Sequence, residues 1–214
     1  MPVMGKEPQQ APRFAVLASG AGSTFGHLAA SSENGRLRGE VVLLMTTEAG
    51  APVASQAIAA GVEHLVLDAD AVDPDAVDET MRQALLQRDI DLVVLAADFG
   101  RIGRRTLEAF SGRIVNTRPA PPPGFGEMST LSERVYQAVL DAGLRTTAAT
   151  VHLVESESDT GPALAATYVP VEPDDTAAAL RSRVQAAERE LLVQTLTRLT
   201  DERSVPADSA KRVE

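Results

Sequence analysis

Apolar runs of a few residues alternate with helical patterns through the first half of the chain. The runs are continuous, as is typical of strands buried on both faces, and they fall at Arg13–Ala18, Val41–Met45, His64–Leu67 and Leu92–Ala96. Helical patterns separate them at Ala51–Ala60 and Pro74–Arg88. In the second of these helices Val77, Met81 and Leu85 recur at i, i+4 and i+8. Strands and helices that alternate in this way predict a doubly wound, parallel α/β sheet.

The second half of the chain follows a different pattern. The proline-rich run Pro119–Gly124 cannot be a helix or a central strand, so it predicts an extended surface loop of a kind that often edges a site. The elements predicted after it are a helix at Leu131–Ala142 that Gly143 ends, strands at Thr146–Val154 and Ala163–Val171, and a helix from about Asp175 to Thr200. Asp174 or Asp175 is the predicted N-cap of that last helix.

A length of 214 residues, at about 150 residues per domain, gives little more than one domain. We therefore predict a single α/β domain at residues 13–200, with a mostly parallel, twisted sheet and helices on both of its faces. Residues 1–12 are rich in Pro and Gln, and we predict that they form a disordered leader. We predict a flexible tail at residues 201–214, where charges and a proline interrupt any periodicity.

The composition excludes several classes of function. Thirty acidic against twenty basic residues give a net charge of −10, which repels phosphate backbones, so any phosphate site must be a local pocket and not a nucleic-acid groove. An aromatic content of 3% argues against stacking on single-stranded bases. The absence of cysteine removes thiol catalysis and thiolate metal sites. With no run of about 20 apolar residues, these features predict a cytoplasmic protein with a small-molecule substrate and no nucleic-acid or membrane partner, and they leave its oligomeric state open.

A glycine loop follows the first predicted strand and leads into a helix. Its residues Gly20, Ala21, Gly22, Ser23 and Thr24 bring backbone N–H groups and a helix N-terminus together, which suits a phosphate. The dinucleotide fingerprint is incomplete, because the place of its third glycine holds a phenylalanine. A tight turn that needs glycines for its shape is the alternative.

A further strand is predicted at Arg113–Pro119, and it carries an amide and a cation at its carboxyl end. Asn116 could donate to a developing oxyanion and Arg118 could hold an anion, or Asn116 could cap the loop while Arg118 is solvated. Asp159 could act as a general base on its turn. His152 on a strand is typical of a packed structural residue, and Glu188 on a helix is typical of a solvated charge.

The order and spacing of several motifs resemble the phosphoribosylglycinamide formyltransferase family. The family has a Ser-Gly-x-Gly-Ser loop after its first strand, an Arg-Ile-Leu stretch, an Asn-x-His-Pro segment, and a Val-His-x-Val segment with an Asp seven residues after its His. The matching segments are Ser19–Ser23, Arg101–Gly103, Asn116–Pro119 and Val151–Val154 with Asp159. The family's Gln-x-x-Glu on the terminal helix matches Gln185 to Glu188.

The resemblance implies the formyltransferase fold and 10-formyltetrahydrofolate as the formyl donor. It implies that the loop Gly20, Ala21, Gly22, Ser23 and Thr24, together with Glu188, binds a phosphorylated substrate. It implies that Arg101, Ile102, Gly103, His152 and Val154 bind the folate. The catalytic positions fall on Asn116, Arg118 and Asp159.

The sequence departs from the family pattern at three of these positions. Thr24 stands in place of an asparagine that often follows the loop serine. Arg118 stands in place of the catalytic histidine, and Gly103 stands in place of the leucine of Arg-Ile-Leu. In the family the Asn and His stabilise an oxyanion and the Asp handles the proton of the attacking amine. An arginine can do the electrostatic part but not the proton transfer.

Three hypotheses follow from this departure. The first is a folate-dependent formyltransferase with an altered amine-type acceptor. The second is an enzyme with non-folate chemistry on the same fold, and the third is a binding homologue without turnover. The first hypothesis predicts that Asn116, Arg118 and Asp159 meet at the carboxyl edge of the sheet, with a folate slot between Arg101–Gly103 and the loop at residues 152–159.

Overall fold

The computed structural model describes residues 10–68, 73–96, 99–119, 133–156 and 161–204. Within these residues a seven-stranded sheet has the order β3-β2-β1-β4-β5-β6-β7. Its strands are β1 (Arg13–Ala18), β2 (Glu40–Thr46), β3 (Glu63–Val66), β4 (Leu92–Ala96), β5 (Ile114–Pro119), β6 (Thr146–Leu153) and β7 (Ala163–Pro170). β1 to β5 pair in parallel, whereas β6 and β7 are antiparallel additions. The predicted mostly parallel α/β sheet is confirmed.

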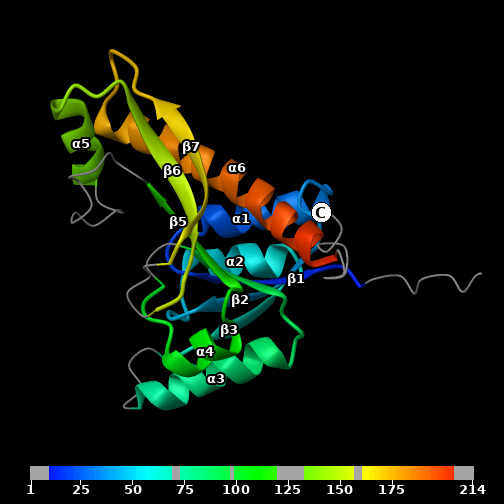
Figure 1. Cartoon of the computed structure of the whole chain (residues 1–214). Coiled ribbons are helices and arrows are strands. Elements are labelled where there is room, and N and C mark those ends of the chain that lie inside the picture. Colours follow the sequence, from blue (N-terminus) through cyan, green and yellow to red (C-terminus); the bar gives the residue numbers. More distant parts are fainter. Residues whose placement is uncertain (1–9, 69–72, 97–98, 120–132, 157–160, 205–214) are drawn as a thin grey trace, which may run out of the picture.

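Helices cover both faces of this sheet (Figure 1). They are α1 (Ser23–Glu33), α2 (Pro52–Ala59), α3 (Pro74–Leu86), α4 (Arg104–Ala109), α5 (Glu133–Asp141) and α6 (Ala177–Ser204). α1, α2 and α6 pack on one face, and α3 and α4 pack on the other. None of the described helices is long and apolar enough to cross a membrane.

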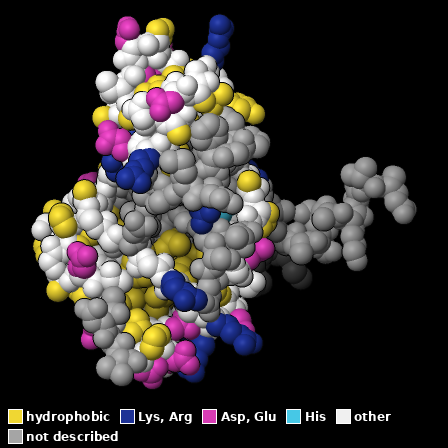
Figure 2. All heavy atoms as spheres, turned by 90° about the vertical axis from the view of Figure 1, so that its left-hand side faces the viewer, with side chains coloured by type: hydrophobic (Ala, Val, Ile, Leu, Met, Phe, Trp, Pro, Cys, Tyr) yellow, Lys and Arg dark blue, Asp and Glu magenta, His cyan; other side chains and the backbone are white. Residues whose placement is uncertain are grey.

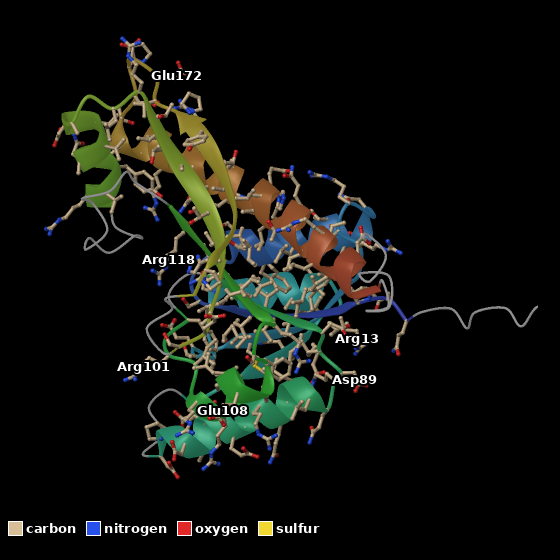
Figure 3. All side chains as sticks on the ribbon, viewed as in Figure 1. Arg13, Asp89, Arg101, Glu108, Arg118 and Glu172 are labelled. Carbon is tan, nitrogen blue, oxygen red and sulfur yellow. The ribbon has the colours of Figure 1, made fainter. Side chains whose placement is uncertain are left out.

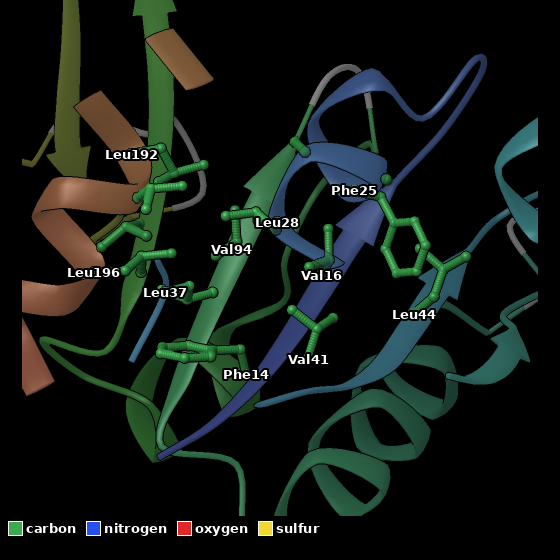
Figure 4. Close-up of a cluster of buried hydrophobic side chains, with 14 of the residues drawn as sticks. Phe14, Val16, Phe25, Leu28, Leu37, Val41, Leu44, Val94, Leu192 and Leu196 are labelled. Carbon is green, nitrogen blue, oxygen red and sulfur yellow. The ribbon is translucent and has the colours of Figure 1, made fainter. Parts of the chain in front are cut away.

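The alternation of side chains along each strand explains why the central strands are apolar throughout. Phe14 and Val16 of β1 belong to the cluster under α1 and α6, as Figure 4 shows, whereas Ala15 and Leu17 belong to the cluster under α3 and α4. A third cluster joins α5 to β6, β7 and the first half of α6 through Tyr136 and its neighbours. A central strand therefore has no polar face to expose.

Three features differ from the sequence prediction. α4 was not predicted, because six residues make fewer than two helical turns and leave no periodic pattern. α6 continues to Ser204, past the predicted end near Thr200. The predicted N-cap of α6 is wrong: the Thr176 hydroxyl oxygen accepts the N–H of Ala179 at 3.1 Å, whereas the Asp175 carboxylate accepts the N–H of Glu172 and pairs with Arg183.

The predicted leader and tail fall largely outside the described residues. Residues 10–12 precede β1, and residues 201–204 belong to α6. The predicted loop at Pro119–Gly124 also falls outside them, except for the last residue of β5.

Candidate active site

The glycine loop connects β1 to α1 at the carboxyl edge of the sheet. Gly20 and Gly22 have left-handed φ angles of 64° and 72°, a conformation that favours glycine. A Cβ on Gly22 would lie 2.3 Å from Cγ2 of Val53, whereas a Cβ on Gly20 would meet nothing within 4 Å. Gly22 is the N-cap of α1 and supplies no side chain to the first-turn amides. The loop therefore has the shape of an anion site made from backbone donors.

α2 holds this loop in place. The N–H of Val53 donates to the carbonyl oxygen of Gly20 at 3.2 Å. The side-chain amide of Gln56 donates to the carbonyl oxygen of Ala21 at 2.6 Å. Because both bonds use carbonyl oxygens of the loop, they leave its N–H groups for other partners.

The polar residues of β5 lie on the sheet face that carries α3 and α4. Asn116 pairs in register with Leu95 of β4 and with His152 of β6, and paired residues point to the same face. Arg118 lies two residues further along the strand and shares this face. Its carbonyl oxygen accepts a hydrogen bond from the Thr150 hydroxyl at 3.2 Å. The strand register therefore brings Asn116, Arg118 and His152 together.

Arg118 lies at the same side of the molecule as Arg101 (Figure 3). Asp159, the third predicted catalytic residue, lies outside the described residues, so its approach to Asn116 stays a prediction. His152 is only 6% exposed, which agrees with a packed residue on this strand.

A cavity of about 530 Å³ opens between α3 and the segment that leads into α4. Its wall includes the predicted folate residues Arg101, Ile102 and Gly103. Ile102 is buried in the same hydrophobic cluster as Val154 and Leu95, and Leu95 is the register partner of Asn116. Figure 2 views this side of the molecule and shows hydrophobic side chains between charged ones in its lower half. The cavity has the size and apolar lining of a small-molecule site.

Glu188 comes from α6, on the opposite face. Its Oε1 atom is buried and has no hydrogen-bond partner among the described residues. Burial raises the pKa of Glu188 to about 7, and the neighbouring Arg189 opposes part of this rise. Burial, and then the Glu188 carboxylate, raise the pKa of Tyr136 on α5. Glu188 is thus a partly buried acid and not the solvated charge that a helical position suggests.

Sequence reasoning missed the α3 wall of the cavity. Asp78 lines the cavity and is 6% exposed, although an aspartate in a helix is ordinarily solvated. The available signal was its spacing, because Asp78, Met81 and Leu85 fall at i, i+3 and i+7 on the buried stripe. Among the described residues, no group of three or more His, Asp and Glu side chains could hold a metal ion.

Comparisons with known proteins agree with this architecture. A family model described as formyl transferase matches residues 12–196. The chain is 32% identical over 203 residues to the chloroplastic phosphoribosylglycinamide formyltransferase of Arabidopsis thaliana, covering 92% of this chain and 68% of that protein. It is 34% identical over 193 residues to phosphoribosylglycinamide formyltransferase of Mycobacterium tuberculosis, covering 90% of this chain and 87% of that protein.

A solved structure gives the same result. Glycinamide ribonucleotide transformylase 1 from Geobacillus kaustophilus superposes with a TM-score of 0.78 at 32% identity, covering 89% of this chain and 99% of that chain. The family model spans most of the chain, and the fold of the solved relative agrees with it. The chain therefore belongs to the phosphoribosylglycinamide formyltransferase family.

Proposed function

We propose that this protein transfers a formyl group from 10-formyltetrahydrofolate to the amino group of a small, phosphorylated or otherwise anionic acceptor. The observation that carries the proposal is the placement of three features around one edge of the sheet. These are the backbone-lined glycine loop after β1, the polar face of β5, and the cavity beside residues 101–103. In open α/β sheets, ligands bind outside the carboxyl ends of the strands.

The folate is assigned to the cavity. Ile102 and the other apolar residues of the wall suit a flat ring. Gly103 lines the same wall, and the Asp78 carboxylate fills the space that a side chain on Gly103 would take. Arg101 lies at the exposed mouth, where a cation suits the carboxylates of a folate. The other two proposed folate residues, His152 and Val154, lie on β6 and the segment after it, and they are not among the residues that line this cavity.

The acceptor is assigned to the loop. The first turn of α1 and residues 20–24 would hold its phosphate through backbone N–H groups and the helix dipole. Glu188 would accept hydrogen bonds from the acceptor, which would supply the partner that its buried oxygen lacks within the described residues. The net charge of −10 does not oppose this, because it is screened beyond about 8 Å in physiological salt.

The formyl group supplied by the folate has an oxygen that gains negative charge as the amine attacks. Asn116 would donate a neutral hydrogen bond to that oxygen and Arg118 a charged one. An arginine stays protonated near pH 7, so Asp159 alone would accept the proton that the attacking amine loses. The bond between the formyl carbon and the folate nitrogen would then break, and that nitrogen would take up the proton. We infer an acceptor whose amine is neutral near pH 7, such as a hydroxylamine or hydrazine, in place of an alkylammonium.

Two measurements test the proposal. Calorimetric titration with tetrahydrofolate tests the cavity, and mass spectrometry of acceptors incubated with 10-formyltetrahydrofolate tests the reaction. We expect micromolar binding and formylation of weakly basic amines in preference to glycinamide ribonucleotide. Absence of tetrahydrofolate binding would contradict the folate assignment, and formylation of glycinamide ribonucleotide at ordinary enzymatic rates would contradict the altered acceptor.

The partners and the location of the protein stay predictions. The Arabidopsis relative is named chloroplastic, so membership of the family does not by itself determine the cellular location of this protein. A small-molecule substrate follows from the proposed reaction, and the acidic charge of the chain supports the absence of a nucleic-acid partner.

A further inference from the structure

Asp78 is a buried carboxylate in the wall between α3 and α4. Its Oδ2 accepts the backbone N–H of Arg105 at 2.8 Å and its Oδ1 accepts that of Thr106 at 3.2 Å. The Thr106 hydroxyl donates in return to the carbonyl oxygen of Asp78 at 3.2 Å. The N-cap of α4 is Gly103, which has no side chain to do this. Asp78 therefore caps α4 from a different helix.

Gly103 is constrained by Asp78 and not by its own backbone. Its φ of −76° is open to any residue. A Cβ built on it would lie 2.2 Å from Cγ of Asp78 and 2.5 Å from Oδ2. The Asp78 carboxylate is held by two N–H donors and cannot turn aside without losing them. The glycine at position 103 and the aspartate at position 78 therefore depend on each other.

Both residues line the cavity assigned to the folate, with Arg101 and Ile102 beside them. We propose that Asp78 and Gly103 form a coupled positioning pair that fixes the backbone of residues 101–103 against the bound folate, an inference that rests on the proposed function. Asp78 anchors the start of α4, and Gly103 gives the carboxylate the space to do so. The pair also explains the departure from the family's Arg-Ile-Leu stretch, because a leucine side chain at position 103 would occupy the place of Asp78.

The ion pairs between α3 and α4 are weaker links. The Arg105 guanidinium lies 3.6 Å from Glu79 and 3.9 Å from Asp75, and its side chain is 53% exposed. Exposed ion pairs of this kind contribute little. Arg105→Ala removes them but keeps the backbone N–H that Asp78 accepts, so it is a matched control.

The experiment compares the unchanged protein with Asp78→Ala, Asp78→Asn, Gly103→Ala, the double variant Asp78→Ala/Gly103→Ala, and Arg105→Ala. Each is titrated with tetrahydrofolate below its melting temperature, and KM is measured separately for the formyl donor and the acceptor. We expect Asp78→Ala and Gly103→Ala each to weaken tetrahydrofolate binding tenfold or more. The double variant should bind no worse than Asp78→Ala, because the clash has gone, and Arg105→Ala should stay within twofold.

A positioning role predicts that KM for the formyl donor rises while KM for the acceptor stays within twofold, a split that a general loss of structure would not give. Asp78→Asn keeps the shape of the side chain and one acceptor oxygen, so it should weaken binding about threefold and stays informative if Asp78→Ala does not fold. Binding by the unchanged protein with equal binding by folded Asp78 variants would overturn this inference alone. No binding by the unchanged protein would overturn the proposed function and the inference with it.

Discussion

The glycine loop after β1 and the polar residues of β5 lie at the same edge of the sheet. The loop would bind through its backbone, whereas β5 would act through its side chains. The loop depends on backbone conformation and on contact with Val53, so few residues other than glycine fit at position 22. β5 is a regular strand, and its backbone would be the same with many side chains at position 118. A site made of backbone keeps its sequence pattern, whereas a site made of side chains can change its chemistry through one substitution. This difference fits the resemblance drawn from the sequence, in which the loop glycines match the family pattern and Arg118 does not.

The largest effect is expected at β5. Arg118→Ala removes one charged donor to the formyl oxygen, and loss of one such donor lowers turnover by about 100 to 1,000-fold. Tetrahydrofolate binding should be nearly unchanged, because the cavity is lined by residues of other elements. Steady-state kinetics and calorimetry together check both parts. Lost acceptor binding with an unchanged turnover number would instead make Arg118 a substrate anchor.

Two conservative variants control this experiment. Arg118→Lys keeps a positive charge but not the planar donor geometry, so it should recover only part of the turnover. Arg118→His introduces the residue that the resemblance to the family implies at this position, and it should raise activity toward an alkylamine acceptor. If Arg118→His has no effect on acceptor preference, the residue at this position does not select the acceptor.

The next effect tests the backbone-built region. Gly22→Ala adds a side chain in a left-handed conformation, which costs about 1 to 2 kcal/mol, and forces it against Val53, which costs about 1 to 3 kcal/mol more. Gly20→Ala has a similar φ but open space around it, so it should cost only about 1 kcal/mol. Thermal or urea unfolding gives both values. Equal losses for the two variants would show that the contact with Val53 does not constrain the loop.

The sequence predicts the elements of the fold that have a local pattern of apolar residues and misses those that depend on distant contacts. β1, β2 and β4 are continuous apolar runs because both of their faces are largely buried, and this pattern predicted them directly. The short apolar run of β3 was predicted in the same way, although β3 is an edge strand and is only half-buried. α4 gave no such signal, because it is short and its start is capped by Asp78 from another helix. The N-cap predicted for α6 is wrong because threonine and aspartate are both good N-caps, and only the structure shows that the Asp175 carboxylate accepts the N–H of Glu172 and pairs with Arg183.

Some parts of the candidate site could be predicted from the sequence and others could not. The loop residues followed from glycine spacing, and the position of Asn116 followed from the end of its strand. The pairing of Asn116 with His152 depends on the register between β5 and β6, which separate runs of sequence do not specify. The Asp78 wall depends on a contact between α3 and α4, and no local pattern in either helix contains it.

A smaller effect should appear in the pH dependence of stability. The folded state holds a proton on Glu188 up to a pH of about 7, whereas an ordinary glutamate has a pKa of 4.5. The free energy of unfolding should therefore fall as pH rises from about 4.5 to about 7, and then level off. Glu188→Gln cannot ionise and lacks this fall, so above pH 7 it should be more stable than the unchanged protein by about 2 kcal/mol. Melting curves at pH 5 and pH 8 check this. If the difference in stability between Glu188→Gln and the unchanged protein is the same at pH 5 and pH 8, Glu188 titrates as a solvated acid.

The smallest effect is expected at the N-cap of α6, which belongs to neither the glycine loop nor β5. It serves as a reference for the larger effects. Thr176→Ala removes the hydroxyl that accepts the N–H of Ala179, and loss of an N-cap costs about 1 kcal/mol. Turnover and tetrahydrofolate affinity should not change, because α6 remains packed through Leu180 and Val184. Asp174→Ala is the matched control at an exposed position and should change stability by less than about 0.5 kcal/mol. If Asp174→Ala costs as much as Thr176→Ala, the cap assignment at α6 is wrong. If Thr176→Ala lowers turnover, then general destabilisation and not the loss of a donor would account for part of the effect expected at Arg118.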